Sequence, residues 1–483
     1  MSATVVRGFF LVLTVGITYA VRHHIFFWDT VQLASRHAHF YYDTNITTLL
    51  LPTAIDSGHP PTFGFYLAIL WKLFGKSLVV SHFAMLPFLW GIVEASYRLG
   101  RYYLGEAKAV WLLVLFFCDP VLLGQSVLVS PDLVLICAML WTWYGWTRTY
   151  STRSTQWIVV VGTLVLAAIS LRGMMIVFAF YSFGALRFLL MGEYRIRPHL
   201  KWFAHFAPAG VMGLAFLLWH HLQVGWIGHH ADSTWAPSFA RVDALGVIKN
   251  TAILGWRWLD FGRIWLWIVL IVLIVTQWQK SISTIVWRKS PTGELVLILV
   301  ILTLVLSPST LLYAGLAQHR YWLPAFLVFT VLVLRLIWVA RLQWVAPRWG
   351  TILVAIGLLT GNLWIYPRTI AQGWDSTLAH LPYYQLRDEL IHDFRAQNVS
   401  LSEVGTAFPN LATEEILALS GDTVHMVPYD LNHQQHIFYS NVMNDFSDEA
   451  LQTLFSEWSI VRRYQKAGVE CIWFWKSDRS ARQ

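Results

Sequence analysis

The sequence predicts a mainly helical, polytopic membrane protein with about eleven transmembrane helices and a small C-terminal α/β domain. Of its 483 residues 56% are hydrophobic and only 13% are charged, a composition that is typical of chains embedded in lipid. The polar residues gather in a few segments, above all in the last hundred or so positions. Eleven apolar runs approach the roughly 20 residues that cross a bilayer, at 5–21, 79–97, 109–125, 133–147, 157–171, 174–191, 202–222, 264–278, 295–312, 323–340 and 351–366.

Basic residues distinguish the two sides of the membrane. Lys and Arg concentrate in alternate loops, and the short loops between them carry almost none except Arg172 and Arg320. Because positively charged loops stay in the cytoplasm, we expect an integral protein of the plasma (inner) membrane with a cytoplasmic N-terminus and an extracytoplasmic C-terminal domain. The basic loops contain residues 98–108, 148–153, 195–201, 280–289 and 341–348.

Several other interpretations of the composition are disfavoured. The first apolar run is long for a secretory signal and lacks a small-residue cleavage pattern, so we count it as a span. The net charge of +8 arises in the predicted cytoplasmic loops, where membrane lipid accounts for it without nucleic acid. Cys118 and Cys137 lie inside predicted spans, which disfavours a disulfide framework. His37 and His39 would face different sides of one helix, so we expect no cofactor and keep a divalent metal only as a less favoured alternative.

Three polar segments lie on the predicted outer side, at 22–77, 225–262 and 371–483. We therefore divide the chain into a transmembrane part, residues 1–370, and a soluble α/β domain, residues 371–483. The end of the first segment is apolar but short for a span, and a start at Pro60-Pro61 and an end near Gly75 favour a helix in the membrane interface. In the last segment the patterns predict a helix over 383–397, a second helix capped by Ser447, and strands at 424–427, 436–439 and 471–475.

Acidic residues of the first outer loop are candidates for catalysis. Asp29 follows the first span directly, where a carboxylate can act as a general base toward a hydroxyl or an amine. Alternatively, Asp29 only caps the helix that follows it. Asp56 and His59 come from a stiff turn before two prolines, and Asp43 adds another acid to this loop.

A second set of polar residues is predicted at the same outer rim. Asp132 opens the fourth span, Arg172 lies between the fifth and sixth, and Arg320 follows His319. A dipole interaction would explain Asp132, and snorkelling would explain either arginine alone. Two arginines with several acids instead indicate a site for an anionic lipid headgroup, because the guanidinium group is well suited to phosphate.

The order of these residues resembles the GT-C glycosyltransferases. The shared elements are Asp29 just after the first span, the Asp-x-x-His-Pro-Pro sequence that starts at Asp56, Asp132 at the start of the fourth span, and the late Arg-Tyr-x-x-Pro sequence that includes Tyr321 and Pro324. The resemblance is strongest to the protein O-mannosyltransferases and their bacterial relatives, the lipid A aminoarabinose transferases (glycosyltransferase family 39-like). It covers roughly residues 1–370 and is specific in the first outer loop.

The resemblance implies that a sugar is transferred from a polyprenyl-phosphate donor to a protein, lipid or glycan acceptor on the outer face of the membrane. It also implies that Asp29 is the base, that the anomeric carbon is inverted, and that Arg320, Arg172 and Tyr321 bind the donor phosphate. Asp43, Asp56 and His59 would then support the acceptor side of the loop.

Two departures from the family pattern concern the acceptor. Thr30 stands where the family usually has a second acid, so Asp29 would work alone or with Asp43 or Asp56. The spacing before His59 is also one residue longer than in the mannosyltransferases.

Two other classes of function stay open. Many spans and outward acids also suit a transporter, but transporters usually carry ionisable groups near the midplane of a repeated fold, and the sequence shows no repeat. The third interpretation is a non-catalytic partner of a glycan assembly machine, in which Asp29 would be replaceable by Asn.

Overall fold

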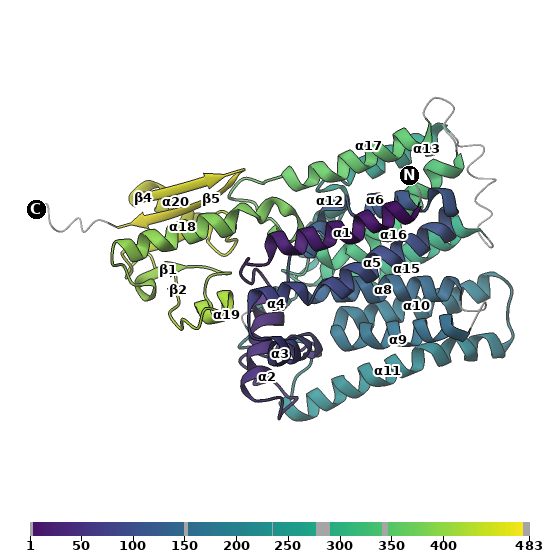
Figure 1. Cartoon of the computed structure of the whole chain (residues 1–483), viewed down its shortest axis with the longest axis horizontal. Coiled ribbons are helices and arrows are strands. Elements are labelled where there is room, and N and C mark those ends of the chain that lie inside the picture. The colour runs from purple at the N-terminus through teal and green to yellow at the C-terminus, as the bar shows by residue number, and fades with distance from the viewer. Residues whose placement is uncertain (1–2, 149–152, 234, 277–289, 341–345, 477–483) are drawn as a thin grey trace, which may run out of the picture.

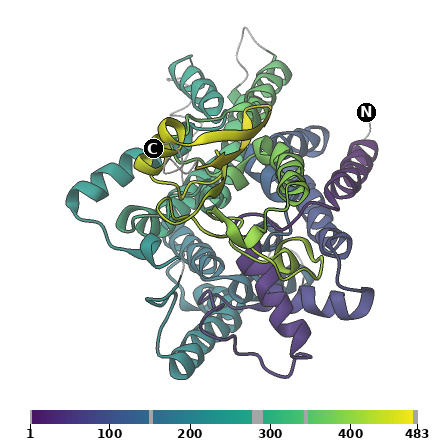
Figure 2. The same ribbon diagram turned by 90° about the vertical axis from the view of Figure 1, so that its left-hand side faces the viewer.

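The computed structural model describes residues 3–148, 153–233, 235–276, 290–340 and 346–476. Long helices lie side by side in a bundle, and a small domain with a sheet packs against one end of it (Figure 1). Figure 2 looks at that end and shows the small domain in front of the bundle, with helices projecting around it. The predicted fold class, a helical membrane protein with a small C-terminal α/β domain, is confirmed.

Every predicted apolar run falls on helical structure. The last residues of the predicted run 264–278 lie outside the described residues, as do Lys280, Arg288, Lys289 and Arg341 of the predicted basic loops. The helices are α1 (Ala3–Val21), α4 and α5 (Leu78–Phe83 and Leu86–Leu104), α6 and α7 (Val110–Phe116 and Pro120–Ser126), α8 (Pro131–Thr147), α9 (Arg153–Ile169), α10 (Leu171–Leu190), α11 (Ile196–Val224), α13 (Ile264–Thr276), α15 (Pro291–Leu312), α16 (His319–Ala340) and α17 (Pro347–Thr360).

Helix length and apolarity alone do not confirm the predicted number of spans. Among the described residues, six helices are long and apolar enough to cross a membrane, or up to eight if each of two sharply bent pairs is one span. The helices α8 and α9 have 17 residues each and α17 has 14, which is short of the roughly 20 that a span needs. The predicted count of about eleven is therefore not confirmed, although a helix stands at each predicted place.

The two bends are tied together by a buried ion pair. The helices α6 and α7 meet at 70°, and α12 (Ala244–Leu259) meets α13 at 82°. Asp119 caps α7 by accepting hydrogen bonds from the N–H groups of Val121 and Leu122 at 2.9 and 3.1 Å. Arg263, just before α13, donates to both carboxylate oxygens of Asp119 at 2.9 Å, and neither side chain is exposed. Because either charge alone would be strongly unfavourable in this interior, the pair couples the two bends.

The first outer loop folds into short helical segments, η1 (Val31–Arg36), α2 (His37–Asp43) and α3 (Thr62–Phe74). The helix α3 starts after Pro61 and ends at Gly75, whose φ of +93° suits glycine. Its 13 residues reach only about 20 Å at 1.5 Å per residue. In Figure 1 α3 is seen nearly end-on while the long helices run across the view. The predicted helix is present, and its position in the membrane interface stays a prediction.

The second outer loop, residues 225–262, contains a helix that was not predicted from the sequence. After the short turn η3 (Ala236–Phe239), Asp243 caps α12 by accepting a hydrogen bond from Gly246 N at 2.8 Å. This loop touches the first one at two glycines. A Cβ atom on Gly58, which has a φ of +70°, would lie 2.5 Å from the carbonyl oxygen of Gly228. The close approach of the two loops therefore requires glycine at position 58.

The C-terminal domain has a five-stranded mixed sheet. The strand order is β2-β1-β3-β5-β4, with β1 parallel to β2 and β3, and β5 antiparallel to β3 and β4. The two predicted helices and the strands at 436–439 and 471–475 are present. The predicted strand at 424–427 overlaps β2 only at Val427, and the structure adds α19, β1 and β4. The elements are α18 (Pro382–Ala396), α19 (Glu414–Ala418), α20 (Asp448–Glu457), β1 (Val404–Thr406), β2 (Val427–Pro428), β3 (His436–Ser440), β4 (Ser459–Lys466) and β5 (Val469–Trp475).

The core of this domain extends into the membrane part. Phe27 and Trp28, from the start of the first outer loop, pack in the same buried cluster as Trp374 and Tyr383. The ring of Phe27 stacks on His380 with 4.8 Å between ring centroids. The domain is thus fixed beside the residue that precedes Asp29. The boundary at residue 370 stays a prediction.

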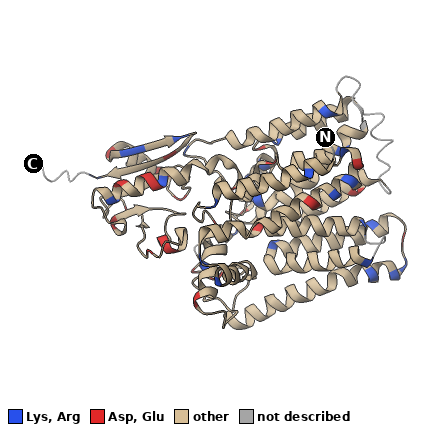
Figure 3. Cartoon of the chain, in the orientation of Figure 1, with Lys and Arg blue, Asp and Glu red and all other residues tan. Residues whose placement is uncertain are grey.

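Lys and Arg gather at the end of the bundle that lies away from the C-terminal domain (Figure 3). This arrangement agrees with basic loops on one side of the membrane. Which face of the membrane that end occupies stays a prediction, and so does the orientation of the two termini.

Candidate active site

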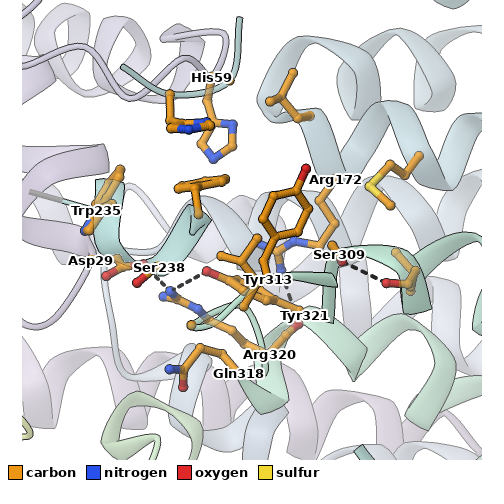
Figure 4. Close-up of a pocket in the computed structure, with 18 of the residues that line it drawn as sticks. Asp29, His59, Arg172, Trp235, Ser238, Ser309, Tyr313, Gln318, Arg320 and Tyr321 are labelled. Atoms are coloured by element: carbon orange, nitrogen blue, oxygen red, sulfur yellow. Dashed lines mark hydrogen bonds and ion pairs between the residues drawn. The ribbon is translucent and has the colours of Figure 1, made fainter. Parts of the chain in front are cut away.

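A cavity of about 400 Å³ lies between the segments 22–77 and 225–262, the first turns of α10 and α16 and the last turns of α15. Part of its wall is apolar, formed among others by Trp28, Leu171 and Trp235. Figure 4 shows Asp29 and Arg320 pointing toward one another in it, with His59 and Gln318 on opposite sides. The polar side chains of the lining are Asp29, His59, Arg172, His229, Ser238, Ser309, Tyr313, Gln318, Arg320 and Tyr321.

Arg320 is the centre of the charged part of the cavity. Its guanidinium group is 5% exposed and contacts three carboxylates that come from distant parts of the chain. Nη2 pairs with Asp29 Oδ2, Nη1 lies 2.8 Å from Asp375 Oδ2, and Nε lies 3.7 Å from Asp132 Oδ2. The predicted outer-rim residues Asp29, Asp132 and Arg320 are therefore brought together.

The capping interpretation of Asp29 is wrong. The residue that caps η1 is Thr30, without a side-chain hydrogen bond to the helix, and the Asp29 carboxylate is turned to Arg320 instead. Trp28 has a φ of +57°, a left-handed conformation that is unusual for a bulky residue and that marks functional sites more often than other places. This turn sends the Trp28 ring toward the C-terminal core and the next carboxylate into the cavity.

Arg172 joins the cluster from the first turn of α10. Its Nη2 lies 2.7 Å from Asp132 Oδ1, and its Nη1 donates to the backbone oxygen of Arg320 at 3.2 Å. The guanidinium also lies 4.5 Å from the ring centroid of Tyr321, close enough for a cation–π contact. Asp132 thus connects the two arginines, and Tyr321 forms the wall beside them.

Asp56 supports the loop and does not face the cavity. Its Oδ2 lies 2.8 Å from Nε2 of His220 on α11, and its Oδ1 accepts a hydrogen bond from Gly58 N at 2.8 Å. Asp43 is exposed at the end of α2. Neither acid contacts Asp29 among the described residues, so of the two alternatives the structure favours the one in which Asp29 works without Asp43 or Asp56. The acids nearest to Asp29 in the Arg320 cluster are Asp375 and Asp132.

His59 reaches the cavity wall as a neutral side chain. It is one of the lining residues, and its Nδ1 atom is buried without a hydrogen-bond partner. Burial, together with the nearby charge of Arg172, lowers the pKa of His59 to about 4. At neutral pH its imidazole is therefore uncharged and can form one more hydrogen bond with a ligand.

His319 lies behind Arg320 and not in the cavity. It is fully buried, with Nε2 2.7 Å from Asp260 Oδ2. Asp260 also accepts a hydrogen bond from the Tyr366 hydroxyl and lies 3.3 Å from Arg257. This buried network anchors the start of α16 and so holds Arg320 in place.

Asp375 is the acid of the Arg320 cluster that was not predicted from the sequence. It lies in the short turn η5 (Trp374–Ser376), after the last helix of the bundle, and is buried. Burial raises the pKa of its carboxyl group to about 6, because the opposing effect of Arg320 is offset in part by Asp29 and Asp132. An acid soon after the final predicted span was visible in the sequence, but nothing in it linked this residue to Arg320.

Among the described residues, no group of three or more His, Cys, Asp or Glu side chains is placed to hold a metal ion. The acids of the cavity are instead grouped around two guanidinium groups. Buried arginines in this geometry suit a phosphate, with which they form short, paired hydrogen bonds. The site can therefore bind an anionic group beside a carboxylate that is able to accept a proton.

The chain is similar to one known protein family and to two solved structures. The model of the dolichyl-phosphate-mannose-protein mannosyltransferase family matches residues 58–221. That stretch runs from the turn before α3 to the end of α11 and includes His59, Asp132, Arg172 and His220.

Two solved structures share the fold over nearly the whole chain. The crystal structure of ArnT from Cupriavidus metallidurans bound to undecaprenyl phosphate is similar with a TM-score of 0.54 and 12% identity, over 98% of this chain and 98% of that one. The same protein in the apo state is similar with a TM-score of 0.51 and 11% identity, over 96% and 97%. A comparison with curated proteins gives no match. The predicted resemblance to GT-C glycosyltransferases is thus confirmed.

Proposed function

We propose that this protein is a glycosyltransferase that moves a sugar from a polyprenyl-phosphate donor to an acceptor on the outer face of the plasma (inner) membrane. The observation that carries the proposal is the pairing of Asp29 with Arg320 at the polar end of a cavity. A potential base and a phosphate-binding cation thereby stand side by side, as a transfer from a phosphate leaving group requires.

The surroundings of the cavity support a lipid-linked donor. Leu171 and Met175 line both the cavity and an adjoining apolar groove of about 620 Å³. A further apolar groove of about 390 Å³ shares Phe178 and Leu217 with the first one and runs between α10 and α11. A donor with its phosphate at Arg320 would find a continuous apolar path for its hydrocarbon chain. Undecaprenyl phosphate in the similar ArnT structure also supports this class of carrier.

The proposed reaction is a single displacement. The bond between the anomeric carbon and the phosphate oxygen breaks, and polyprenyl phosphate leaves with its negative charge held by Arg320 and Arg172. The acceptor hydroxyl or amine attacks the opposite face of the sugar, which inverts the anomeric carbon. Asp29 takes the proton that the acceptor loses.

The pairing of Asp29 with Arg320 also suggests how the base becomes available. Without donor, the Asp29 carboxylate is held by the arginine, and an ion-paired carboxylate is a weaker base. A donor phosphate that engages Arg320 replaces this partner. Asp29 is then free beside the sugar only when a donor is present.

The transporter alternative leads to a different expectation for purified protein. A transporter would bind its cargo and release it unchanged, whereas the proposed enzyme would convert a lipid-linked sugar to polyprenyl phosphate. Lipid extraction and mass spectrometry of the purified chain should therefore reveal a polyprenyl-phosphate sugar or its free carrier.

The test of Asp29 compares two variants that carry the same substitution in the same loop. Membranes with Asp29→Asn should contain folded protein and fail to convert the copurifying donor, whereas Asp43→Asn, at an exposed site outside the cavity, should convert it at the normal rate. Full conversion by Asp29→Asn would contradict the assignment of the base. If the wild-type protein neither copurifies with a lipid-linked sugar nor converts one, the proposed function is wrong.

A further inference from the structure

Asp375 reaches the donor side of the cavity from the segment that leads into the C-terminal domain. Its Oδ2 atom lies 2.8 Å from Nη1 of Arg320, and its side chain is 1% exposed. The contact does not have the geometry of a hydrogen bond, since Asp375 Oδ2 is buried without a hydrogen-bond partner. Arg320 Nε, which lies 3.7 Å from Asp132 Oδ2, is in the same state. Buried polar atoms left in this state are rare and generally have a reason.

The backbone around Asp375 is held in one position. Its carbonyl oxygen accepts a hydrogen bond from Gln125 Nε2 at 2.9 Å. Gln125 belongs to α7, and this helix approaches so closely that a Cβ atom on the adjacent Gly124 would lie 2.8 Å from that same carbonyl oxygen. The neighbouring Trp374 is 2% exposed in the core of the C-terminal domain. The carboxyl group is therefore presented to Arg320 by rigid structure and cannot easily move away when a ligand arrives.

The charges of the cluster do not balance. Arg320 and Arg172 face the carboxylates of Asp29, Asp132 and Asp375. An anionic phosphate would add a further negative charge to a site from which water is largely excluded, where repulsion between like charges is strong. Asp29 gives up its contact with Arg320 to the phosphate in the proposed reaction but stays charged in the same cavity. The repulsion is therefore relieved only when another carboxylate becomes neutral.

Asp375 is the carboxylate best placed to become neutral. Asp132 is also paired with Arg172 at 2.7 Å, and Asp29 lies on the open cavity. Within the described part of the chain, the partners of the Asp375 carboxyl group are Arg320 and Ser376, whose Oγ donates a hydrogen bond at 3.3 Å. Consistent with this, burial already raises its pKa to about 6.

We propose that Asp375 is a positioning residue that holds Arg320 in the empty site and takes up one proton from solvent when a donor phosphate engages Arg320. The inference rests on the proposed function, because it needs a phosphate at Arg320. It means that the affinity for the donor rises as the pH falls, and that a residue next to the C-terminal domain sets this dependence.

We do not expect the other titratable groups near Asp375 to take up this proton. His59 faces the same cavity and His380 lies in the turn η6 (Leu378–His380), and burial lowers the pKa of each to about 4. His319 is held by Asp260, and Asp119, at the start of the adjoining α7, is held by Arg263. Tyr321 forms the neighbouring wall.

The probe for the test is a polyprenyl methyl phosphate diester, which keeps one negative charge across the pH range. A phosphate monoester is unsuitable because its own second pKa is near 6. Binding to the full-length protein in detergent is measured between pH 5.5 and 7.5. If binding requires protonated Asp375, a pKa of about 6 implies an affinity loss of about 25-fold over this range. Calorimetry at pH 7 in buffers of different ionisation enthalpy should show an uptake of close to one proton.

Two variants distinguish proton uptake by Asp375 from a purely structural role of this residue. Asp375→Asn should bind the probe with a nearly pH-independent affinity and without proton uptake. Glu414→Gln breaks a buried pair with Arg387 in the C-terminal domain, away from the cavity, and should keep the wild-type pH profile even if it lowers stability. A wild-type protein that binds the probe without proton uptake, or an Asp375→Asn variant that keeps the pH profile, overturns the inference. If the wild-type protein fails to bind the probe at any pH, the proposed function itself fails.

Discussion

Replacing Asp29 by Asn should affect donor binding and sugar transfer in opposite directions. The carboxylate pairs with Arg320 when the site is empty, so it competes with the donor phosphate for that guanidinium group. Asn removes the competing charge and also removes the group that would accept the acceptor proton. We therefore expect tighter binding of the donor together with a large loss of transfer.

The two magnitudes follow from the contacts. A hydrogen bond to a charged group is worth about 1.5–3 kcal/mol, and Asn retains part of it. We therefore expect Asp29→Asn to bind the donor roughly tenfold more tightly, which corresponds to about 1.4 kcal/mol. A positioned general base contributes about 10²–10⁴-fold to the rate, which corresponds to roughly 2.7–5.4 kcal/mol.

The assay measures both quantities in the same membranes. Donor affinity is obtained from displacement of a labelled lipid-linked sugar, and transfer from the single-turnover release of polyprenyl phosphate. Asp43→Asn is the matched control, because this acid is exposed and remote from Arg320. Transfer within threefold of wild type, or a donor affinity that falls tenfold, would refute the assignment of Asp29.

Three further substitutions test other contacts of the structure. Arg263→Met leaves Asp119 buried without its partner and should lower the free energy of unfolding by about 3–5 kcal/mol; an unchanged thermal midpoint in detergent would contradict this. Gly58→Val places a side chain against the carbonyl oxygen of Gly228 at a position with a left-handed backbone conformation, which should lower the free energy of unfolding by about 1–3 kcal/mol. A protease should then cut the second outer loop faster than in wild type. Equal resistance would argue against the contact between the two loops. Arg172→Lys keeps the charge but loses the planar fork and should weaken donor affinity about tenfold; loss of the transfer rate at saturating donor, with affinity unchanged, would count against a role in binding.

The elements that follow from local patterns were predictable from the sequence. Apolar runs of near-spanning length located every described helix of 17 residues or more. Pro60-Pro61 with Gly75 located α3, because these residues act on their own neighbourhood. The strand β4 was missed because it lies at the edge of the sheet and is largely exposed, so no apolar alternation marks it. The helix α12 was missed although Asp243 provides a capping signal, because its polar surroundings favoured a loop.

The candidate site was only partly predictable. Asp29 and Arg320 stood out because each is an ionisable residue at the rim of a membrane protein, but they are 291 positions apart and no local pattern pairs them. Asp375 gave even less signal, since its role depends on how the C-terminal segment packs against α7. The bend between α6 and α7 also depends on a distant partner, Arg263.

The apolar grooves beside the cavity imply that the donor concentration should be expressed relative to the lipid and not to the volume of solution. Phe178 and Leu214 in their walls are 59% and 70% exposed, so the grooves open sideways along the bundle, in the direction of the acyl chains. A substrate that enters this way is drawn from a two-dimensional solution, and its effective amount is a mole fraction of the lipid. Adding detergent or lipid at constant total donor should then slow the reaction by dilution within the bilayer or micelle, and Michaelis constants given in molar units would not be comparable between preparations.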